Sequence, residues 1–150
     1  MTPARRRDLA ITAAVLLASA CGGAGSDDVR ISEAWARPTP AGATVAAVYF
    51  RLETGDDDRL VAATVDKSIA GQVELHATLT DDSTGAARMD PLNGVAVDGG
   101  EPVTFEPGGN HAMLVDLPVP LAAGATFDVT LQLERAGPQV VEVTVREEAP

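Results

Sequence analysis

The stretch Pro107-Gly108-Gly109-Asn110-His111-Ala112-Met113-Leu114-Val115-Asp116 combines a tight turn with a short strand. Proline and two glycines predict the turn, and apolar residues follow it at strand spacing. Residues two apart in a strand share a face, so His111 and Met113 are expected to point the same way just after the turn. The stretch therefore predicts both a β element and a pair of candidate metal ligands.

Six other segments have the same character, being short, rich in β-branched residues and often alternating. They are residues 45–52, 59–65, 72–77, 103–105, 126–133 and 140–145. Turn sequences rich in Gly, Asp and Pro separate them, and the sequence has no convincing amphipathic helix. Short strands at this regular spacing predict an all-β fold, a Greek-key antiparallel β-sandwich or barrel.

The first 20 residues have the features of a signal peptide. Three arginines at 5–7 precede an apolar run at 9–17, and small residues at 18–20 lead to Cys21. A membrane-spanning helix needs about 20 apolar residues, so the short run predicts export rather than a span. The export route, Sec or twin-arginine, stays open.

Cys21 is the only cysteine, which excludes an intramolecular disulfide. Residues 17–21, Leu-Ala-Ser-Ala-Cys, resemble a bacterial lipobox, although Ala18 replaces the usual branched residue. We expect lipidation at Cys21 and a lipoprotein of the cell envelope, anchored to the outer face of the cytoplasmic membrane or periplasmic. A simple cleaved signal with a free thiol is the alternative.

The charge of the chain excludes some partners. Residues 1–20 hold three Arg and one Asp, so their removal changes the net charge from −11 to −13. Such an acidic protein is not expected to bind nucleic acid, and we expect membrane contact only through the lipid anchor. Composition predicts a flexible tether at 21–28, one β-domain at 29–147 and a short tail at 148–150. We expect a monomer.

The chain has two histidines and, after the initiator, two methionines: His76, Met89, His111 and Met113. Imidazole and thioether together favour Cu(I) over hard cations. The alternative is that the histidines lie on the surface and the methionines fill the core. If the strands of His76 and His111 are neighbours and Met89 folds back over them, the four residues form a ligand cup at one end of the sandwich.

Carboxylates near these residues are candidates for orienting the histidines. Alternation places Glu74 and Thr78 on the same face as His76. Glu106 precedes the turn before His111. Glu74 and Glu106 could each accept a hydrogen bond from a ligand histidine.

The chain resembles the PCuAC family of periplasmic copper chaperones, in residues 34–42, 47–50, 73–76 and 107–114. The His-x-Met pair and the 21 residues between Met89 and His111 also match. The resemblance implies a cupredoxin-like β-sandwich with a surface Cu(I) site of two His and two Met, and leaves Cu(II) open. It also implies delivery to the Cu-A centre of cytochrome c oxidase subunit II, directly or through another assembly factor.

The chain departs from the family pattern in two places near the ligands. The hairpin between His76 and Met89 is slightly longer than usual, at little energetic cost. Thr78 stands where many members carry an additional Met nearby.

Other functions have less support in the sequence. We do not expect an enzyme, because no Ser/His/Asp set, phosphate loop or paired carboxylates stand out. An electron-transfer cupredoxin needs a Cys ligand, and the only cysteine lies at the signal junction. A copper buffer or resistance protein and a metal-free, Ig-like surface interaction module remain as alternatives.

Overall fold

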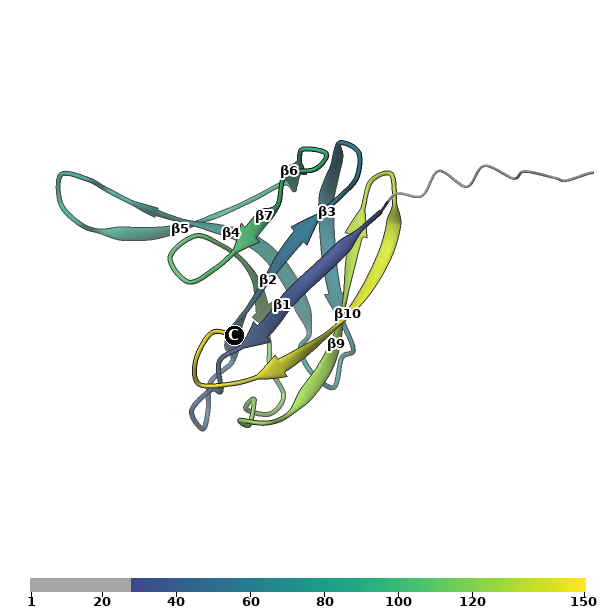
Figure 1. Cartoon of the computed structure of the whole chain (residues 1–150). Coiled ribbons are helices and arrows are strands. Elements are labelled where there is room, and N and C mark those ends of the chain that lie inside the picture. The colour runs from purple at the N-terminus through teal and green to yellow at the C-terminus, as the bar shows by residue number, and fades with distance from the viewer. Residues whose placement is uncertain (1–27) are drawn as a thin grey trace, which may run out of the picture.

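The computed structural model describes residues 28–150, in which every regular element is a strand (Figure 1). The predicted signal peptide, the predicted lipidation site Cys21 and all but the last residue of the predicted tether lie outside the described residues. Within residues 28–150, no helix is long and apolar enough to cross a membrane. The all-β prediction is confirmed.

Ten strands follow one another along the chain. They are β1 (Arg30–Ala36), β2 (Val45–Glu53), β3 (Asp58–Val65), β4 (Gln72–Thr80), β5 (Ala87–Pro91), β6 (Val95–Val97), β7 (Val103–Phe105), β8 (Asn110–Val115), β9 (Thr126–Leu133) and β10 (Gly137–Val145). Three of them, β1, β5 and β6, are additional to the segments that the sequence pattern predicts.

The strands form one sheet in the order β5-β4-β8-β7-β2-β1-β10-β9-β3-β6, with β8 also paired to β2. The sheet curls on itself around the core, and the β4–β5 hairpin projects away from the body (Figure 1). Two pairs, β1 with β10 and β7 with β8, are parallel. The other strand pairs are antiparallel, in agreement with the expected antiparallel β-sandwich or barrel.

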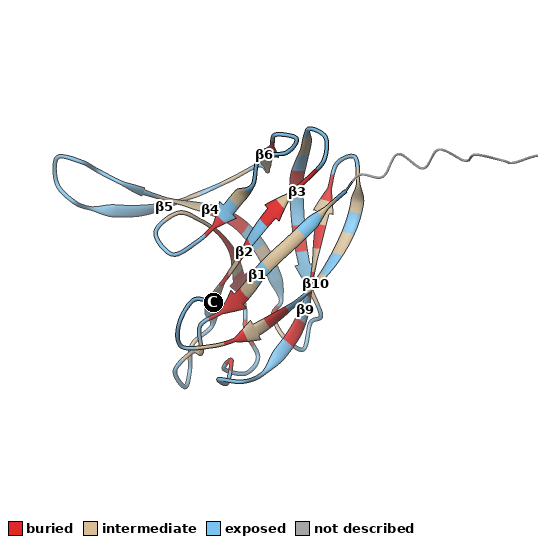
Figure 2. Ribbon diagram, in the orientation of Figure 1, coloured by how far each residue is buried: buried red, intermediate tan, exposed pale blue. Residues whose placement is uncertain are grey.

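Alternation along the strands builds the core. In β9, Phe127, Val129, Leu131 and Leu133 are buried, whereas Asp128 between them is exposed. Figure 2 shows such alternating buried positions on the inner strands and an exposed far end of the β4–β5 hairpin. The buried side chains of the inner face are therefore mainly apolar.

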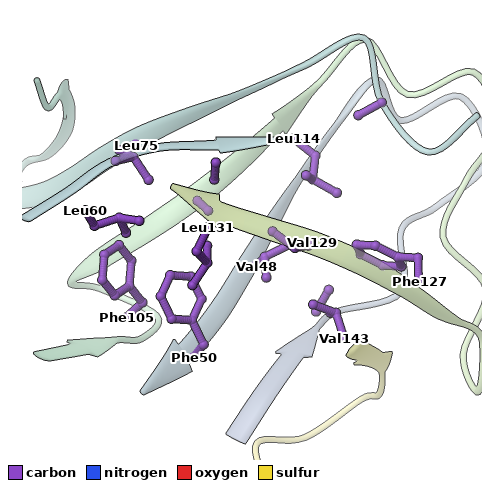
Figure 3. Close-up of a cluster of buried hydrophobic side chains, with 14 of the residues drawn as sticks. Val48, Phe50, Leu60, Leu75, Phe105, Leu114, Phe127, Val129, Leu131 and Val143 are labelled. Carbon is purple, nitrogen blue, oxygen red and sulfur yellow. The ribbon is translucent and has the colours of Figure 1, made fainter. Parts of the chain in front are cut away.

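Two stacked phenylalanines belong to this core (Figure 3). Phe50 of β2 and Phe105 of β7 are cross-strand partners, and their ring centroids are 4.2 Å apart. Both side chains are almost completely buried. Their contact ties the short strand β7, which precedes the turn before His111, to the body of the sheet.

We expect Phe50→Ala to lower the free energy of unfolding by about 3–5 kcal/mol, because it removes a buried ring and leaves a cavity. Urea denaturation measures the change. Val140→Ala, at an exposed position, is the control and should change it by less than about 0.5 kcal/mol. A loss below about 1 kcal/mol for Phe50→Ala would contradict the contribution of the stacked rings to the core.

Asp58 joins the start of β3 to the turn between β9 and β10. Its Oδ1 accepts hydrogen bonds from the backbone N–H groups of Arg59 and Arg135, at 2.7 and 2.9 Å. Its Oδ2 accepts one from Ala136, also at 2.9 Å. Partial burial raises the pKa of Asp58, but these donors and the Arg135 charge outweigh it and hold the pKa below its usual range. The ionised carboxylate therefore stabilises the fold.

We expect Asp58→Asn to lower the free energy of unfolding near neutral pH by about 1–2 kcal/mol. Because the pKa is lower in the folded state, this stabilisation is present above the unfolded-state pKa and is lost as the pH falls through the folded-state value. The difference between wild type and variant should thus vanish in acid, as urea titrations at several pH values would measure. Asp82→Asn, at an exposed turn position, is the control. A difference independent of pH would contradict the assignment.

Candidate metal centre

The pairing of β4 with β8 brings the two histidines together. His76 and His111 are direct cross-strand partners in this antiparallel pair. The neighbouring pair on the same face is Glu74 with Met113. The condition stated for the ligand cup, that the two strands be neighbours, is met.

The histidines lie on the face of the sheet that points away from the main core. Leu75 and Ala112, which alternate with them, are buried in the core cluster. His76 and His111 are nevertheless only 8% and 3% exposed. The resemblance implies a surface site, but the two imidazoles are shielded from solvent on this outer face.

Met89 lies at the open side of this arrangement. It is the cross-strand partner of Thr78 in the β4–β5 pair. Thr78 lies two residues beyond His76 in β4, so Met89 is on the same face of the sheet as His76. The strand β5 is the edge of the sheet, and Met89 is 58% exposed. Among the four candidate ligands, Met89 is the most accessible from solvent, and Met113 is intermediate.

The two imidazole rings face each other edge to face. Their centroids are 5.8 Å apart and their planes make an angle of 62°. A metal ion typically lies about 2 Å from an imidazole nitrogen. The two rings are therefore close enough to bind one ion between them.

Each imidazole uses one nitrogen in a hydrogen bond and leaves the other without a partner. His76 Nε2 lies 2.9 Å from Glu74 Oε2, and His111 Nδ1 lies 3.2 Å from the Gly109 carbonyl oxygen. His76 Nδ1 and His111 Nε2 are buried and have no hydrogen-bond partner. Because buried polar atoms are nearly always satisfied, these two nitrogens make the imidazole pair a candidate ligand site.

The acceptors for the histidines are only partly those that the sequence predicts. Glu74 contacts His76 as expected. The partner of His111 is the Gly109 carbonyl and not Glu106, because the turn folds that carbonyl back toward β4, where it also accepts the Thr78 N–H at 3.0 Å. Every residue has a backbone carbonyl, so side-chain identity could not have identified this acceptor. The only signal in the sequence is the turn that precedes His111.

A metal site at the two histidines would require methionine sulfur as a further ligand. Within residues 28–150, no group of three or more His, Cys, Asp or Glu side chains is placed to hold a metal. The thioethers of Met113 and Met89 lie on the same face as the histidines. Such a donor set is soft and neutral, which disfavours Ca²⁺ and Mg²⁺.

Aromatic residues continue the outer face beyond Met113. Trp35 and Tyr49 are cross-strand partners with ring centroids 4.9 Å apart, and the Arg37 guanidinium lies 5.8 Å from the Trp35 ring. Burial raises the pKa of Tyr49, and the Arg37 charge lowers it by less. The phenol stays protonated near neutral pH, so Tyr49 supplies no anionic ligand.

Comparison with known sequences identifies a family. A sequence model of the family described as "Putative lipoprotein LpqE-like" matches residues 29–145. A protein of Leifsonia xyli subsp. xyli, named "Putative lipoprotein Lxx21020", is 32% identical over 123 residues, which are 81% of this chain and 72% of that protein. The family model covers nearly all of the described β-domain.

Comparison with solved structures identifies the fold. The copper-bound PCuAC domain from PmoF2 superimposes with a TM-score of 0.63 and 24% identity, over 81% of this chain and 93% of that domain. The solution structure of CuI-DR1885 from Deinococcus radiodurans gives a TM-score of 0.60 and 24% identity, over 85% and 84%. The chain therefore belongs to the LpqE-like family, and its domain has the PCuAC fold.

Proposed function

We propose that this protein is an extracytoplasmic copper chaperone. It binds Cu(I) through His76, Met89, His111 and Met113, and it delivers the ion to the Cu-A centre of cytochrome c oxidase or to another assembly factor. The protein acts as a carrier and not as an enzyme, so copper is its cargo.

One observation carries the proposal: two buried imidazoles face each other, and each has one nitrogen without a partner. Leaving a buried polar atom unsatisfied costs about 1–3 kcal/mol, so a fold that keeps two of them adjacent needs a reason. A bound cation is such a reason, because it accepts the lone pairs of both imidazole nitrogens. The thioethers on the same face select a soft ion, for which Cu(I) is the preferred candidate.

The copper bound to two structural neighbours supports the proposal. The PCuAC domain from PmoF2 is copper-bound, and DR1885 carries Cu(I). This chain shares their fold, and its candidate ligands are of a type that suits the same ion. Copper is therefore the metal to test first.

The unequal exposure of the ligands suits a protein that gives its metal away. His76 and His111 are buried, whereas Met89 is 58% exposed on an edge strand. An incoming ligand from an acceptor could replace the thioether of Met89 while the histidines still hold the ion. Neutral ligands also leave the copper as a single positive charge, held less tightly than by thiolates.

The proposed location is the cell envelope. The family description and the name of the Leifsonia relative both contain the word lipoprotein. A lipid on Cys21 would hold the domain at the membrane, with residues 21–28 as a tether. That placement suits delivery to a membrane-bound acceptor.

Two alternatives use the same fold differently. A copper buffer or resistance protein would bind Cu(I) with the same residues but would not transfer it to an acceptor. A metal-free, Ig-like interaction module would leave the two buried imidazole nitrogens without a partner. An electron-transfer cupredoxin needs a Cys ligand, and residues 28–150 contain no cysteine.

Competition titration of the full chain with a Cu(I) chelator tests the ligand set. We expect one Cu(I) per chain, with the affinity reduced more than about tenfold, or 1.4 kcal/mol, by His76→Ala, His111→Ala or Met113→Leu. Met89→Leu should weaken binding less, because solvent or added ligands reach that position. Leucine preserves the volume of methionine and removes only the sulfur.

Leu79→Ala is the matched control, because Leu79 is an exposed apolar residue next to the Met89 partner Thr78 but on the other face of the hairpin. It should leave the affinity unchanged. Failure of the parent to bind Cu(I), or equal binding by all four variants, would refute the copper site.

Stability gives a second test. We expect His111→Leu to leave the unfolding free energy of the metal-free protein unchanged or to raise it by up to about 1 kcal/mol, because it removes a buried unsatisfied nitrogen. The Gly109 carbonyl keeps the Thr78 N–H as a partner. Free Cu(I) at 100 times its dissociation constant should stabilise the wild type by about 2.7 kcal/mol and the variant much less.

Chemical denaturation with and without Cu(I) measures both effects. Leu114→Ala, in the core behind the site, is the control for sensitivity and should cost about 2–5 kcal/mol in either condition. A large loss of stability for metal-free His111→Leu would mean that the histidine is a structural residue.

A further inference from the structure

We infer that Glu74 is a positioning residue that fixes which nitrogen of His76 binds the metal. Its carboxylate keeps the proton of His76 on Nε2, so that His76 binds through Nδ1 while His111 binds through Nε2. This inference rests on the proposed copper function, and it adds a residue and a donor-atom assignment to it.

The chemistry of the acceptor sets the tautomer of His76. An ionised carboxylate can only accept hydrogen bonds, so the 2.9 Å contact between His76 Nε2 and Glu74 Oε2 requires the proton on Nε2. A neutral imidazole has one N–H and one lone pair. The lone pair of His76 is therefore on Nδ1, the atom that is buried without a partner.

His111 has the opposite tautomer for the same reason. A carbonyl oxygen also only accepts, so the 3.2 Å contact with Gly109 requires the proton on His111 Nδ1. The remaining lone pair is on Nε2, which is again the buried atom without a partner. In each ring, the nitrogen that carries the lone pair is therefore the buried nitrogen without a hydrogen-bond partner.

Glu74 is itself held in place. Gln72, two residues earlier on the same face of β4, donates a hydrogen bond of 3.1 Å from its side-chain amide to Glu74 Oε1. The two oxygens of Glu74 thus accept different hydrogen bonds, Oε1 from Gln72 and Oε2 from His76. The cross-strand partner of Glu74 is Met113, so the carboxylate lies beside the proposed ligands and remains partly exposed, at 44% of its side chain.

This arrangement would spare the site a rearrangement when metal arrives. Neither ring has to rotate or exchange a proton between its nitrogens, which lowers the entropic cost of binding. A carboxylate on the far nitrogen also increases the basicity of an imidazole ligand. The contribution of Glu74 is therefore to affinity through His76, without contact with the ion.

NMR of the ¹⁵N-labelled full chain, recorded near pH 8, tests the assignment. Protonated and unprotonated ring nitrogens have well-separated ¹⁵N shifts. Without metal, we expect the proton on Nε2 of His76 and on Nδ1 of His111. Titration with Cu(I) should then shift mainly His76 Nδ1 and His111 Nε2.

Variants separate positioning from a merely structural role. Glu74→Ala should leave His76 as a mixture of tautomers and weaken Cu(I) binding about tenfold. Glu74→Gln should retain most of the tautomer preference and affinity, because its amide oxygen can still accept from Nε2. Glu142→Ala, at an exposed glutamate of β10, is the matched control and should change neither.

The outcomes distinguish this inference from the proposed function. Copper bound to His76 through Nε2, a proton on His76 Nδ1 in the metal-free protein, or an unchanged tautomer in Glu74→Ala would overturn the role of Glu74 and leave the copper site intact. Absence of any Cu(I)-induced shift would overturn the copper proposal and the metal part of this inference with it.

Discussion

The antiparallel pairing of β4 with β8 is the constraint on which both the core and the candidate site depend. Its register places His76 opposite His111 and, one residue along, Leu75 opposite Ala112. A slip by one residue would turn the histidines inward and expose the core residues. The buried inner face therefore fixes the register, and the register fixes the geometry of the imidazole pair.

Local pattern was enough to predict most of the fold. Alternation and turn residues identify seven of the ten strands, including β9 with its regular burial. They miss β1, where the left-handed Glu33, with φ 54°, lies at an irregularity that breaks the alternation. They also miss β5, which is polar and exposed at the sheet edge, and β6, which has only three residues. Parallel pairing of β1 with β10 joins the two ends of the domain, and no local pattern carries that information.

Some features of the candidate site could likewise be predicted from the sequence, and others could not. The two-residue period predicts correctly that His111 and Met113 share a face, and that Glu74 lies with His76. It does not predict burial, because shielding of an outer face depends on turns and neighbouring strands that come from elsewhere in the chain. The sequence also offers Glu106 as a candidate acceptor for a histidine, whereas the acceptor at His111 is the backbone carbonyl of Gly109. Side-chain chemistry is readable from sequence, but a carbonyl becomes a specific acceptor only when the backbone is folded.

The site combines rigidity on one side with access on the other. His76 and His111 are in the interior of paired strands whose opposite face is packed core, so their rings have little freedom to move. Met89 is on the edge strand of a projecting hairpin and has one strand neighbour. In a copper carrier these properties serve different steps, because fixed imidazoles lower the cost of binding the ion and an exposed thioether is the ligand that an acceptor can reach. Affinity and release then reside in different residues, so each can change without the other.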